Sequence, residues 1–403
     1  MAPGGAPEVA PPSKRVRATD DPCIVTMQKM LKGKEGILSL AQGIVHWAPP
    51  PAVAAAVVAA AADPESSAYG ADDGTAELRA ALKAKLRTEN ALDGVEVMVT
   101  AGANQAFTNV VIAVLDADDG AVLFSPFYFN HMMALQMTGG GASVIRGPVR
   151  EDFLPDVEWL ERRLAQDGGP RIRMVTLVNP CNPTGIMAPA ELLSRASAAC
   201  ARHGAWLVVD NTYELFSYEA EGMPPHSCVG GDHVVNIFSF SKAYGMMGWR
   251  VGYIAYPPRL HGELMKAQDT IAICPAVASQ KAAFAAAGAG APWVKERVAG
   301  LSENKRIVCA AIDAALGEGQ YVGGSGAIYL MVRLPSACGD DMRVVEWLND
   351  RHKVCVIPGS ACGAPGTVRV CYANLVPERC REAAARLQAG LRELCERGAA
   401  ALA

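Results

Sequence analysis

The segment that decides the fold lies between Val97 and Ala106 and reads VMVTAGANQA. Its first four residues favour a buried β-strand, and the Ala-Gly pair after them favours a tight turn. The residues from Ala103 onward favour a helix, whose free N-terminal amides and dipole would attract an anion. One such turn is weak evidence by itself, because an ordinary strand–helix connection has the same pattern.

The same alternation of short apolar strands and longer helices continues on both sides of this segment. Leucines recur every fourth residue in 76–90, which predicts an amphipathic helix. Further strands are predicted at 121–124, 173–178, 206–209 and 234–238. This order is typical of a mostly parallel sheet flanked by helices, in which ligands bind beyond the carboxyl ends of the strands.

The pattern changes after about residue 290, where a smaller α+β domain is expected. Helices are predicted at 291–316, 341–352 and 377–397, with a β-run at 327–332 between the first two. We therefore divide the chain into four parts, which are a disordered tail (1–22), an N-terminal arm associated with the small domain (23–48), a large domain (49–290) and the small domain (291–403).

The composition excludes several classes of protein. The 37 basic and 41 acidic side chains give a net charge of −4, and no concentrated basic surface for nucleic acid is evident. The longest apolar run, 49–62, is too short to span a membrane, and no secretory signal is recognisable. The twelve cysteines lack the spacing of a disulfide framework. We expect a soluble, cytoplasmic protein with reduced thiols.

A lysine follows one of the predicted strands, in the string FSFSK that ends at Lys242. A lysine amine can condense with an aldehyde only when it loses its proton, which burial and nearby cations favour. Ser239, Ser241 and Arg250 are hydrogen-bond donors of the kind that a phosphate monoester needs. Without these neighbours, a surface lysine and an unrelated arginine would be the ordinary interpretation.

A carboxylate ends another predicted strand, in the string WLVVD that stops at Asp210. A carboxylate there could keep a pyridine nitrogen protonated, which makes the ring an electron sink. Tyr213 follows three residues later. The alternative, that Asp210 caps a following helix, stays open.

The string NPCNPTG covers residues 179–185 and follows a third predicted strand. Two X-Pro units within four residues fix a rigid turn, from which an asparagine amide could donate to a phenolic oxygen. A turn of this kind is ordinary, but the doubled Asn-Pro followed by Thr-Gly is specific.

Taken in order, these strings identify a resemblance that covers residues 24–397. The chain resembles the class I/II aminotransferases among the fold-type I enzymes that depend on pyridoxal phosphate, whose large domain has a seven-stranded, mostly parallel sheet. The matching strings are YGADDG at 69–74 with Leu78-Arg79, TAGANQA at 100–106, NPCNPTG at 179–185, DNTY at 210–213, SFSK at 239–242 and Arg250.

The resemblance implies a catalytic role for three residues. Lys242 would bind pyridoxal 5′-phosphate as a Schiff base and then move the proton. Asp210 would pair with the pyridinium nitrogen, while Tyr213, together with Asn182, would hydrogen-bond the 3-oxygen of the ring. No metal ion is implied.

The remaining cofactor contacts implied by the resemblance surround the phosphate and the ring. Ala103 and Asn104 would give backbone amides to the phosphate, joined by Ser239 and Arg250. Tyr128 would stack on the ring.

The resemblance also implies substrate contacts and a homodimer. Arg369 would bind the α-carboxylate of the substrate together with Asn182, and Gly43 would close over it. Tyr69 would reach the phosphate of the neighbouring subunit, so the active site would depend on a dimer.

The string GIVHWAPP at 43–50 departs from the Gly-x-Pro-Asp type of many relatives and resembles a plant and green-algal group of cytosolic aminotransferases. That group uses methionine and aromatic amino acids, with aromatic 2-oxo acids such as phenylpyruvate or indole-3-pyruvate as acceptors. Six side chains could line a matching apolar pocket or simply pack in the core; they are Trp47, Phe127, Tyr128, Phe129, Met246 and Met247.

Two alternative enzymes remain open on the sequence. A C–S lyase would use the same Lys242 to eliminate sulfur from one amino acid. An aminotransferase of the aspartate or alanine type would use 2-oxoglutarate. A regulatory protein that senses the cofactor is disfavoured, because the 22-residue tail is too short for a DNA-binding module.

Overall fold

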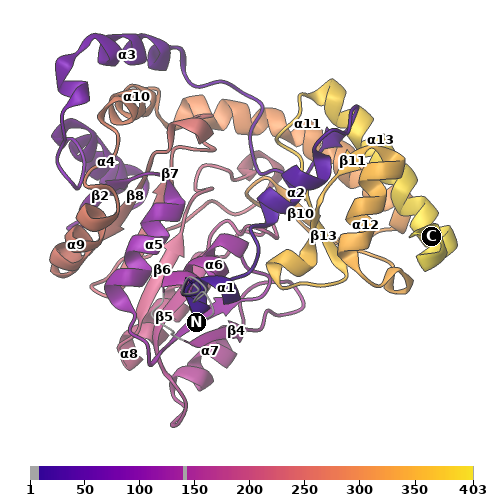
Figure 1. The fold of residues 1–403 in the computed structure, drawn as a ribbon, viewed down its shortest axis with the longest axis horizontal. Helices are drawn as coiled ribbons and strands as arrows, with labels where there is room; N and C mark the ends of the chain where they lie inside the picture. The colour runs from indigo at the N-terminus through magenta and orange to yellow at the C-terminus, as the bar shows by residue number, and fades with distance from the viewer. Residues whose placement is uncertain (1–8, 139–142, 403) are drawn as a thin grey trace, which may run out of the picture.

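The computed structural model describes residues 9–138 and 143–402, which contain a seven-stranded, a four-stranded and a two-stranded sheet (Figure 1). The large sheet has the order β2-β8-β7-β6-β5-β3-β4. All neighbouring strands are parallel except β8, which runs antiparallel to both β2 and β7. Its strands are β2 (Glu96–Thr100), β3 (Asp119–Phe124), β4 (Ser143–Gly147), β5 (Arg171–Val178), β6 (Trp206–Asp210), β7 (Val234–Ser239) and β8 (Gly252–Tyr256).

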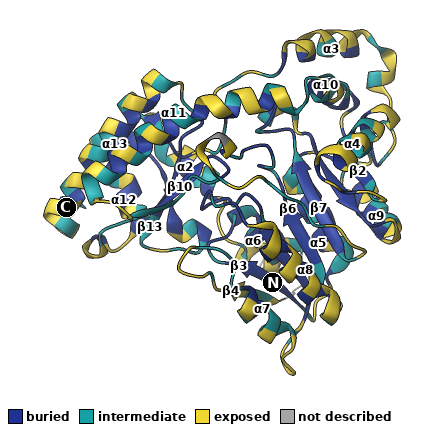
Figure 2. Ribbon diagram, turned by 180° about the vertical axis from the view of Figure 1, so that it is seen from behind, coloured by how far each residue is buried: buried dark blue, intermediate teal, exposed yellow. Residues whose placement is uncertain are grey.

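Helices cover both faces of the large sheet, because its strands are apolar on both sides. Val208 of β6 packs in one core with α5, α6 and α9, whereas Leu207 and Val209 pack in another with α7 and α8. The strands other than the edge strand β4 are accordingly mostly buried in Figure 2, while the outer sides of the helices are exposed. The bounds are α5 (Ala103–Val114), α6 (Phe129–Thr138), α7 (Val157–Leu164), α8 (Ala190–His203) and α9 (His261–Ala272).

The end of the large sheet at β2 carries three more helices. Leu78, Leu82 and Leu86 of α4 are fully buried, as their four-residue spacing predicts. The alanine-rich run forms α3, which packs on α10. The bounds are α3 (Pro51–Ala62), α4 (Ala76–Glu89) and α10 (Val277–Ala287).

The C-terminal part of the chain forms the four-stranded sheet, in the order β12-β13-β10-β9, beside α11, α12 and α13 (Figure 1). A pair of short parallel strands, β1 and β11, joins the N-terminal segment to this part. The bounds are β1 (Leu38–Ser39), β9 (Tyr321–Gly323), β10 (Tyr329–Arg333), β11 (Val354–Cys355), β12 (Ile357–Pro358), β13 (Thr367–Cys371), α2 (Cys23–Leu31), α11 (Gly290–Leu316), α12 (Asp341–Trp347) and α13 (Pro377–Arg397).

The predicted fold class is confirmed, but some elements differ from the expectation. β4 and the antiparallel β8 were not anticipated. The N-terminal tail was expected to be disordered, yet its described part contains a short helix, α1 (Lys14–Ala18). Ser13 caps this helix, which packs on α6, and the amide of Asp20 donates to Oε1 of Gln136 (3.0 Å). Residues 1–8 lie outside the described part. The division into domains stays a prediction; the boundary expected near residue 290 falls at the start of α11.

Candidate active site

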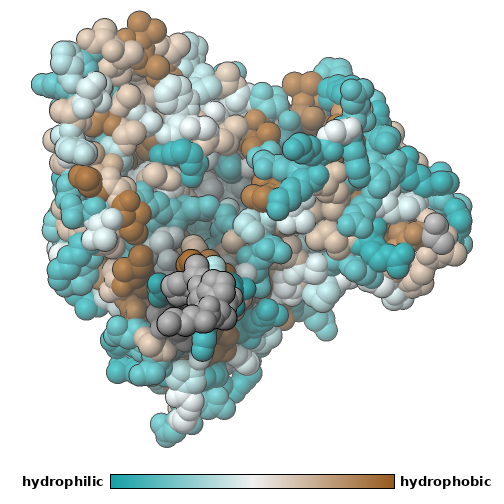
Figure 3. Space-filling view, in the orientation of Figure 1, coloured by the Kyte–Doolittle hydropathy of each residue, from teal (hydrophilic) through white to brown (hydrophobic). Residues whose placement is uncertain are grey.

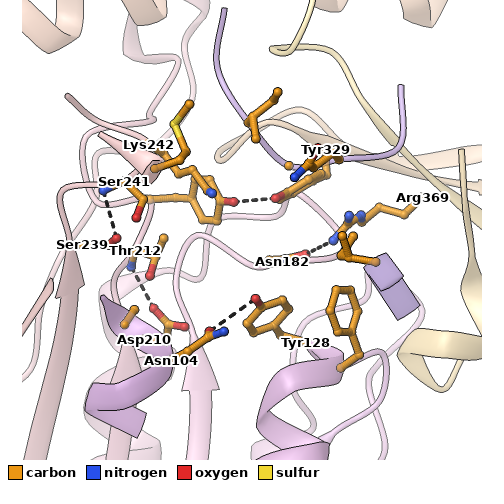
Figure 4. Close-up of a pocket in the computed structure, with 18 of the residues that line it drawn as sticks. Asn104, Tyr128, Asn182, Asp210, Thr212, Ser239, Ser241, Lys242, Tyr329 and Arg369 are labelled. Atoms are coloured by element: carbon orange, nitrogen blue, oxygen red, sulfur yellow. Dashed lines mark hydrogen bonds between the residues drawn. The ribbon is translucent and has the colours of Figure 1, made fainter. Parts of the chain in front are cut away.

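A cavity of about 410 Å³ lies beyond the carboxyl ends of β5, β6 and β7 (Figure 4). The structure brings eleven of the twelve predicted site residues to its wall, which are Gly43, Ala103, Asn104, Tyr128, Asn182, Asp210, Tyr213, Ser239, Lys242, Arg250 and Arg369. The remaining residue, Tyr69, lies elsewhere.

Lys242 follows the end of β7 by three residues, and its side chain extends into the cavity (Figure 4). Burial lowers its pKa from the ordinary 10.5 to about 8, and the positive charges of Arg250 and Arg369 act in the same direction. Within the described residues, its amine has no hydrogen-bond partner. The amine is therefore both accessible from the cavity and easily deprotonated, as a nucleophile toward an aldehyde must be.

Asp210 is the last residue of β6, and its carboxylate has two partners. One oxygen accepts a hydrogen bond from the amide of Thr212 (2.9 Å), and the other lies 3.1 Å from Nε2 of His131. Burial raises the pKa of Asp210, but the contact with His131 and the bonds from Thr212 outweigh it, so the pKa lies below its ordinary value. No helix begins after Asp210, because residues 212–215 form a turn, so the helix-cap interpretation is wrong.

His131 was not predicted from the sequence. It lies on α6, where its ring stacks on Phe107 with 4.0 Å between the ring centroids. Its other nitrogen, Nδ1, is buried without a hydrogen-bond partner. A usable signal was its position three residues after Tyr128, which directly precedes α6 and whose ring meets that of His131 edge to face with 5.1 Å between the centroids.

An anion cradle is formed where β2 turns into α5. Gly102 has a φ of 84°, a conformation that suits glycine, and α5 begins directly after it. Arg250 adopts a left-handed conformation (φ 52°), from which its guanidinium donates to the carbonyl oxygen of Ala101 (3.2 Å). A Cβ on Gly102 would lie 2.1 Å from Nη2 of Arg250, and one on Gly252 would lie 2.7 Å from the amide nitrogen of Ala103. Both glycines therefore keep the cradle open for a ligand.

Tyr128 lies between the cradle and Arg369 (Figure 4). Its hydroxyl donates to Oδ1 of Asn104 (3.4 Å) and accepts from Nδ2 of Asn130 (2.9 Å). These contacts hold the phenol ring in place at the wall of the cavity, where a planar ligand could stack on it.

Arg369 reaches the cavity from β13 of the other sheet, and only 2% of the residue is exposed. Its guanidinium donates to Oδ1 of Asn182 (2.8 Å) and to the carbonyl oxygen of Ala41 (2.9 Å). Its Nε is buried without a partner. Because Asn182 accepts through its oxygen, its amide nitrogen is free to donate to a ligand.

Tyr213 makes a short hydrogen bond to the hydroxyl of Tyr329 (Figure 4). Burial raises the pKa of both phenols, so both keep their protons at neutral pH. Tyr329, on β10, was not predicted. No signal in the sequence connects it with Tyr213, which is more than a hundred residues away along the chain.

Tyr69 and three of the six expected apolar pocket residues do not line the cavity. Tyr69 is 81% exposed and lines a separate surface pocket near α3 and α10. Of the six apolar candidates, Tyr128, Phe129 and Met247 line the cavity, together with Ile24 and Ile44, which were not predicted. The other three do not line it and pack in or against the hydrophobic core; they are Trp47, Phe127 and Met246.

This fold, with a buried lysine, a strand-end carboxylate and an anion cradle, defines the fold-type I class of pyridoxal-phosphate-dependent enzymes. The donor set fits the cofactor, because the cradle can take the phosphate, the unpaired amine of Lys242 can take the aldehyde and Asp210 can take the ring nitrogen.

Comparisons with known proteins narrow this class. Residues 35–387 match the family model "Aminotransferase class I and II", and the chain belongs to that family. It is 50% identical over 390 residues to the aromatic aminotransferase ISS1 of Arabidopsis thaliana, covering 96% of this chain and 98% of that protein. It is 30% identical over 311 residues to an aspartate/prephenate aminotransferase of Thermus thermophilus, covering 76% of this chain and 79% of the relative. The solved structure of an aspartate aminotransferase mutant of Thermus thermophilus superimposes with a TM-score of 0.84 at 27% identity, over 95% of this chain and all of the other.

The chain is therefore a pyridoxal-phosphate-dependent aminotransferase, as the sequence predicts. All twelve of its cysteines are unpaired in the structure. Among residues 9–138 and 143–402, none of the helices combines the length and the apolar character needed to cross a membrane.

Proposed function

We propose that this aminotransferase moves an amino group between methionine or an aromatic L-amino acid and an aromatic 2-oxo acid such as phenylpyruvate or indole-3-pyruvate. The observation that carries this proposal is the set of apolar side chains that line the cavity together with Arg369, which are Ile24, Ile44, Phe129 and Met247. The 50% identical relative in Arabidopsis is named an aromatic aminotransferase.

The cations of the cavity support the same choice of substrate. Its described wall has three, which are Lys242, Arg250 and Arg369. Arg250 lies at the anion cradle and Lys242 carries the cofactor, so one arginine is left for the substrate. An aspartate-type substrate has a second carboxylate, for which the wall formed by one subunit holds no further cation among its described residues.

The residues present fit specific roles toward the cofactor. Bound pyridoxal 5′-phosphate supplies an aldehyde for covalent attachment and a protonated ring that withdraws electrons. Lys242 would hold it covalently, and Asp210 would keep the ring nitrogen protonated. Asn182 and Tyr213 would donate to the ring oxygen, and Tyr128 would stack on the ring. The phosphate would be held by Ala103, Asn104, Ser239 and Arg250.

The substrate would be held at its α-carboxylate by Arg369, since a guanidinium binds a carboxylate through two parallel hydrogen bonds. Gly43 would cover it from the N-terminal segment. Nζ of Lys242, once free, would take the proton from the α-carbon and return it to the former aldehyde carbon of the cofactor. The oxo acid product then leaves before the second substrate binds, which makes the reaction ping-pong.

A pairwise screen of amino donors against oxo-acid acceptors with the purified enzyme tests the substrate proposal. We expect methionine and phenylalanine with phenylpyruvate or indole-3-pyruvate to react faster than aspartate with 2-oxoglutarate. The reverse preference would overturn the substrate proposal and leave the family unchanged. Release of ammonia with pyruvate or 2-oxobutyrate from one sulfur amino acid, without an acceptor, would instead support a C–S lyase.

A homodimer is proposed from the surface around Tyr69. Its exposed ring lines a pocket with Val277 and Phe284, and Val58 of α3 is also exposed nearby. Apolar side chains lie along the side of the molecule that carries α3 and α5 (Figure 3). A second copy of the chain would cover this surface and receive Tyr69 at its own phosphate site.

Mixing two inactive variants tests this arrangement. If Tyr69 acts across the interface, subunits with Tyr69→Ala and subunits with Lys242→Ala rebuild one intact site in each mixed dimer. A statistical mixture should then recover about one quarter of the wild-type activity. Recovery would be absent if Tyr69 served its own subunit.

The cytoplasm is proposed as the location of the enzyme, supported by its twelve unpaired cysteines. A fluorescent fusion at the C-terminus tests this proposal, and accumulation in plastids would refute it.

A further inference from the structure

Tyr329 lines the active-site cavity, yet the proposed chemistry gives it no task. We infer that Tyr329 is a positioning residue, whose hydroxyl donates to Tyr213 and thereby directs the proton of Tyr213 toward the cofactor. This inference rests on the proposed contact between Tyr213 and the ring oxygen of the cofactor.

The segment that carries Tyr329 is fixed by contacts with the loops that follow β5 and β6. The amide of Ala327 donates to the carbonyl oxygen of Phe216 (3.0 Å), and that of Gly326 donates to the carbonyl oxygen of Gly185 (3.0 Å). The backbone is packed so closely that a Cβ on Gly185 would lie 2.0 Å from the carbonyl oxygen of Tyr329. The hydroxyl of Tyr329 is therefore held at one place relative to Tyr213, which lies three residues before Phe216.

Either hydroxyl can donate in the bond between Tyr213 and Tyr329, and the proposal assigns the donation to Tyr329. A Cβ on Gly43 would lie 1.9 Å from the hydroxyl oxygen of Tyr329, so the N-terminal segment passes close to this oxygen on one side. Its one hydrogen-bond partner within the described residues is Tyr213. If Tyr329 donates, Tyr213 keeps a proton that it can give to a ligand.

Burial keeps both hydroxyls protonated, against the positive charge that faces this pair. The guanidinium of Arg369 lies 4.4 Å from the centroid of the Tyr329 ring, and Cys371 and Tyr128 are the other titratable groups near it. Burial nevertheless raises the pKa of both tyrosines, despite the opposing charge of Arg369. Two protons are thus available at neutral pH, one for the shared bond and one for the cavity.

A donor that itself accepts a hydrogen bond becomes a stronger donor. Tyr329 would therefore strengthen the bond from Tyr213 to the ring oxygen and stabilise negative charge there. Protonation at the cofactor's covalent link to Lys242 would then occur at a lower pH than without Tyr329. This effect is visible, because the absorption of the bound cofactor changes with that protonation.

The test is a pH titration of the visible absorption of cofactor-loaded enzyme, with melting temperature as the measure of folding. Tyr213→Phe should raise the pH midpoint most, and Tyr329→Phe should raise it by about 0.5 unit. The double variant should match Tyr213→Phe alone, because Tyr329 acts through Tyr213. Tyr372→Phe is the matched control, since Tyr372 is buried and donates to the carbonyl oxygen of Ala327 (3.1 Å) outside the cavity wall.

Four results would overturn the inference. An unchanged midpoint in Tyr329→Phe, or a shift that adds fully to that of Tyr213→Phe, would show that Tyr329 does not act through Tyr213. An equal shift in the Tyr372→Phe control would assign the effect to loosening of the segment. An unchanged midpoint in Tyr213→Phe would also refute the proposed contact between Tyr213 and the ring oxygen. The Tyr213→Phe result therefore distinguishes a failure of that contact from a failure of the Tyr329 inference alone.

Discussion

The lowered pKa of Lys242 predicts how fast the enzyme without cofactor captures pyridoxal phosphate at each pH. Burial shifts this pKa from 10.5 to about 8, and only the neutral amine attacks an aldehyde. At pH 7 about one tenth of the amine is then neutral, compared with roughly 3 in 10,000 for an ordinary lysine, an advantage of about 300-fold. The capture rate should rise about tenfold per pH unit below pH 8 and level off above it.

Stopped-flow absorption of cofactor capture between pH 6 and pH 10 measures this profile. The matched control is a free lysine derivative with a blocked α-amine, whose rate should keep rising beyond pH 9 because its pKa is about 10.4. Borohydride reduction followed by peptide mapping should label Lys242, and Lys242→Ala should capture no cofactor at this position. A rate that continues to rise tenfold per unit through pH 10 would refute the argument that burial activates the amine.

Three substitutions test the other parts of the site. Arg369→Lys should lower kcat/KM for amino acids about 100-fold or more, mainly through KM, because an ammonium lacks the paired donors; steady-state kinetics measure this, and an unchanged KM would contradict it. Asp210→Asn should lower the single-turnover rate constant about 100-fold or more, because the amide cannot carry the charge that keeps the ring nitrogen protonated. A loss of less than threefold would be incompatible with that role. Gly252→Ala should weaken cofactor binding about tenfold or more, because its Cβ would lie 2.7 Å from the amide nitrogen of Ala103. Cofactor titration measures this, with Gly248→Ala as the control, since a Cβ at Gly248 meets nothing within 4 Å.

The parts of the site that could be predicted from the sequence lie at the ends of strands. Asp210 and Lys242 follow buried apolar runs, and parallel strands bring their carboxyl ends to one edge of a sheet. Their neighbourhood therefore follows from the strand pattern. The helix with Leu78, Leu82 and Leu86 was equally clear, because all three leucines face the core.

The parts that could not be predicted depend on contacts between distant elements. β8 is buried throughout, and nothing local in its sequence distinguishes an antiparallel from a parallel strand. Tyr329 meets Tyr213 only because the segment after β9 returns to the large sheet. Ile24 reaches the cavity from α2, which lies in the expected N-terminal arm, where no helix was predicted.

Arg369 joins three separate parts of the chain, since it stands on β13 and bonds to Asn182 and to Ala41. The groups proposed to select the substrate therefore come mainly from the N-terminal segment and the smaller sheet, whereas those proposed to hold the cofactor stand mainly on the larger sheet. Mutations in the groups that select the substrate can alter which amino acid binds, while the groups that hold the cofactor, and with them the reaction, stay unchanged. Such a separation would allow one ancestral fold to give rise to enzymes with different substrate specificities.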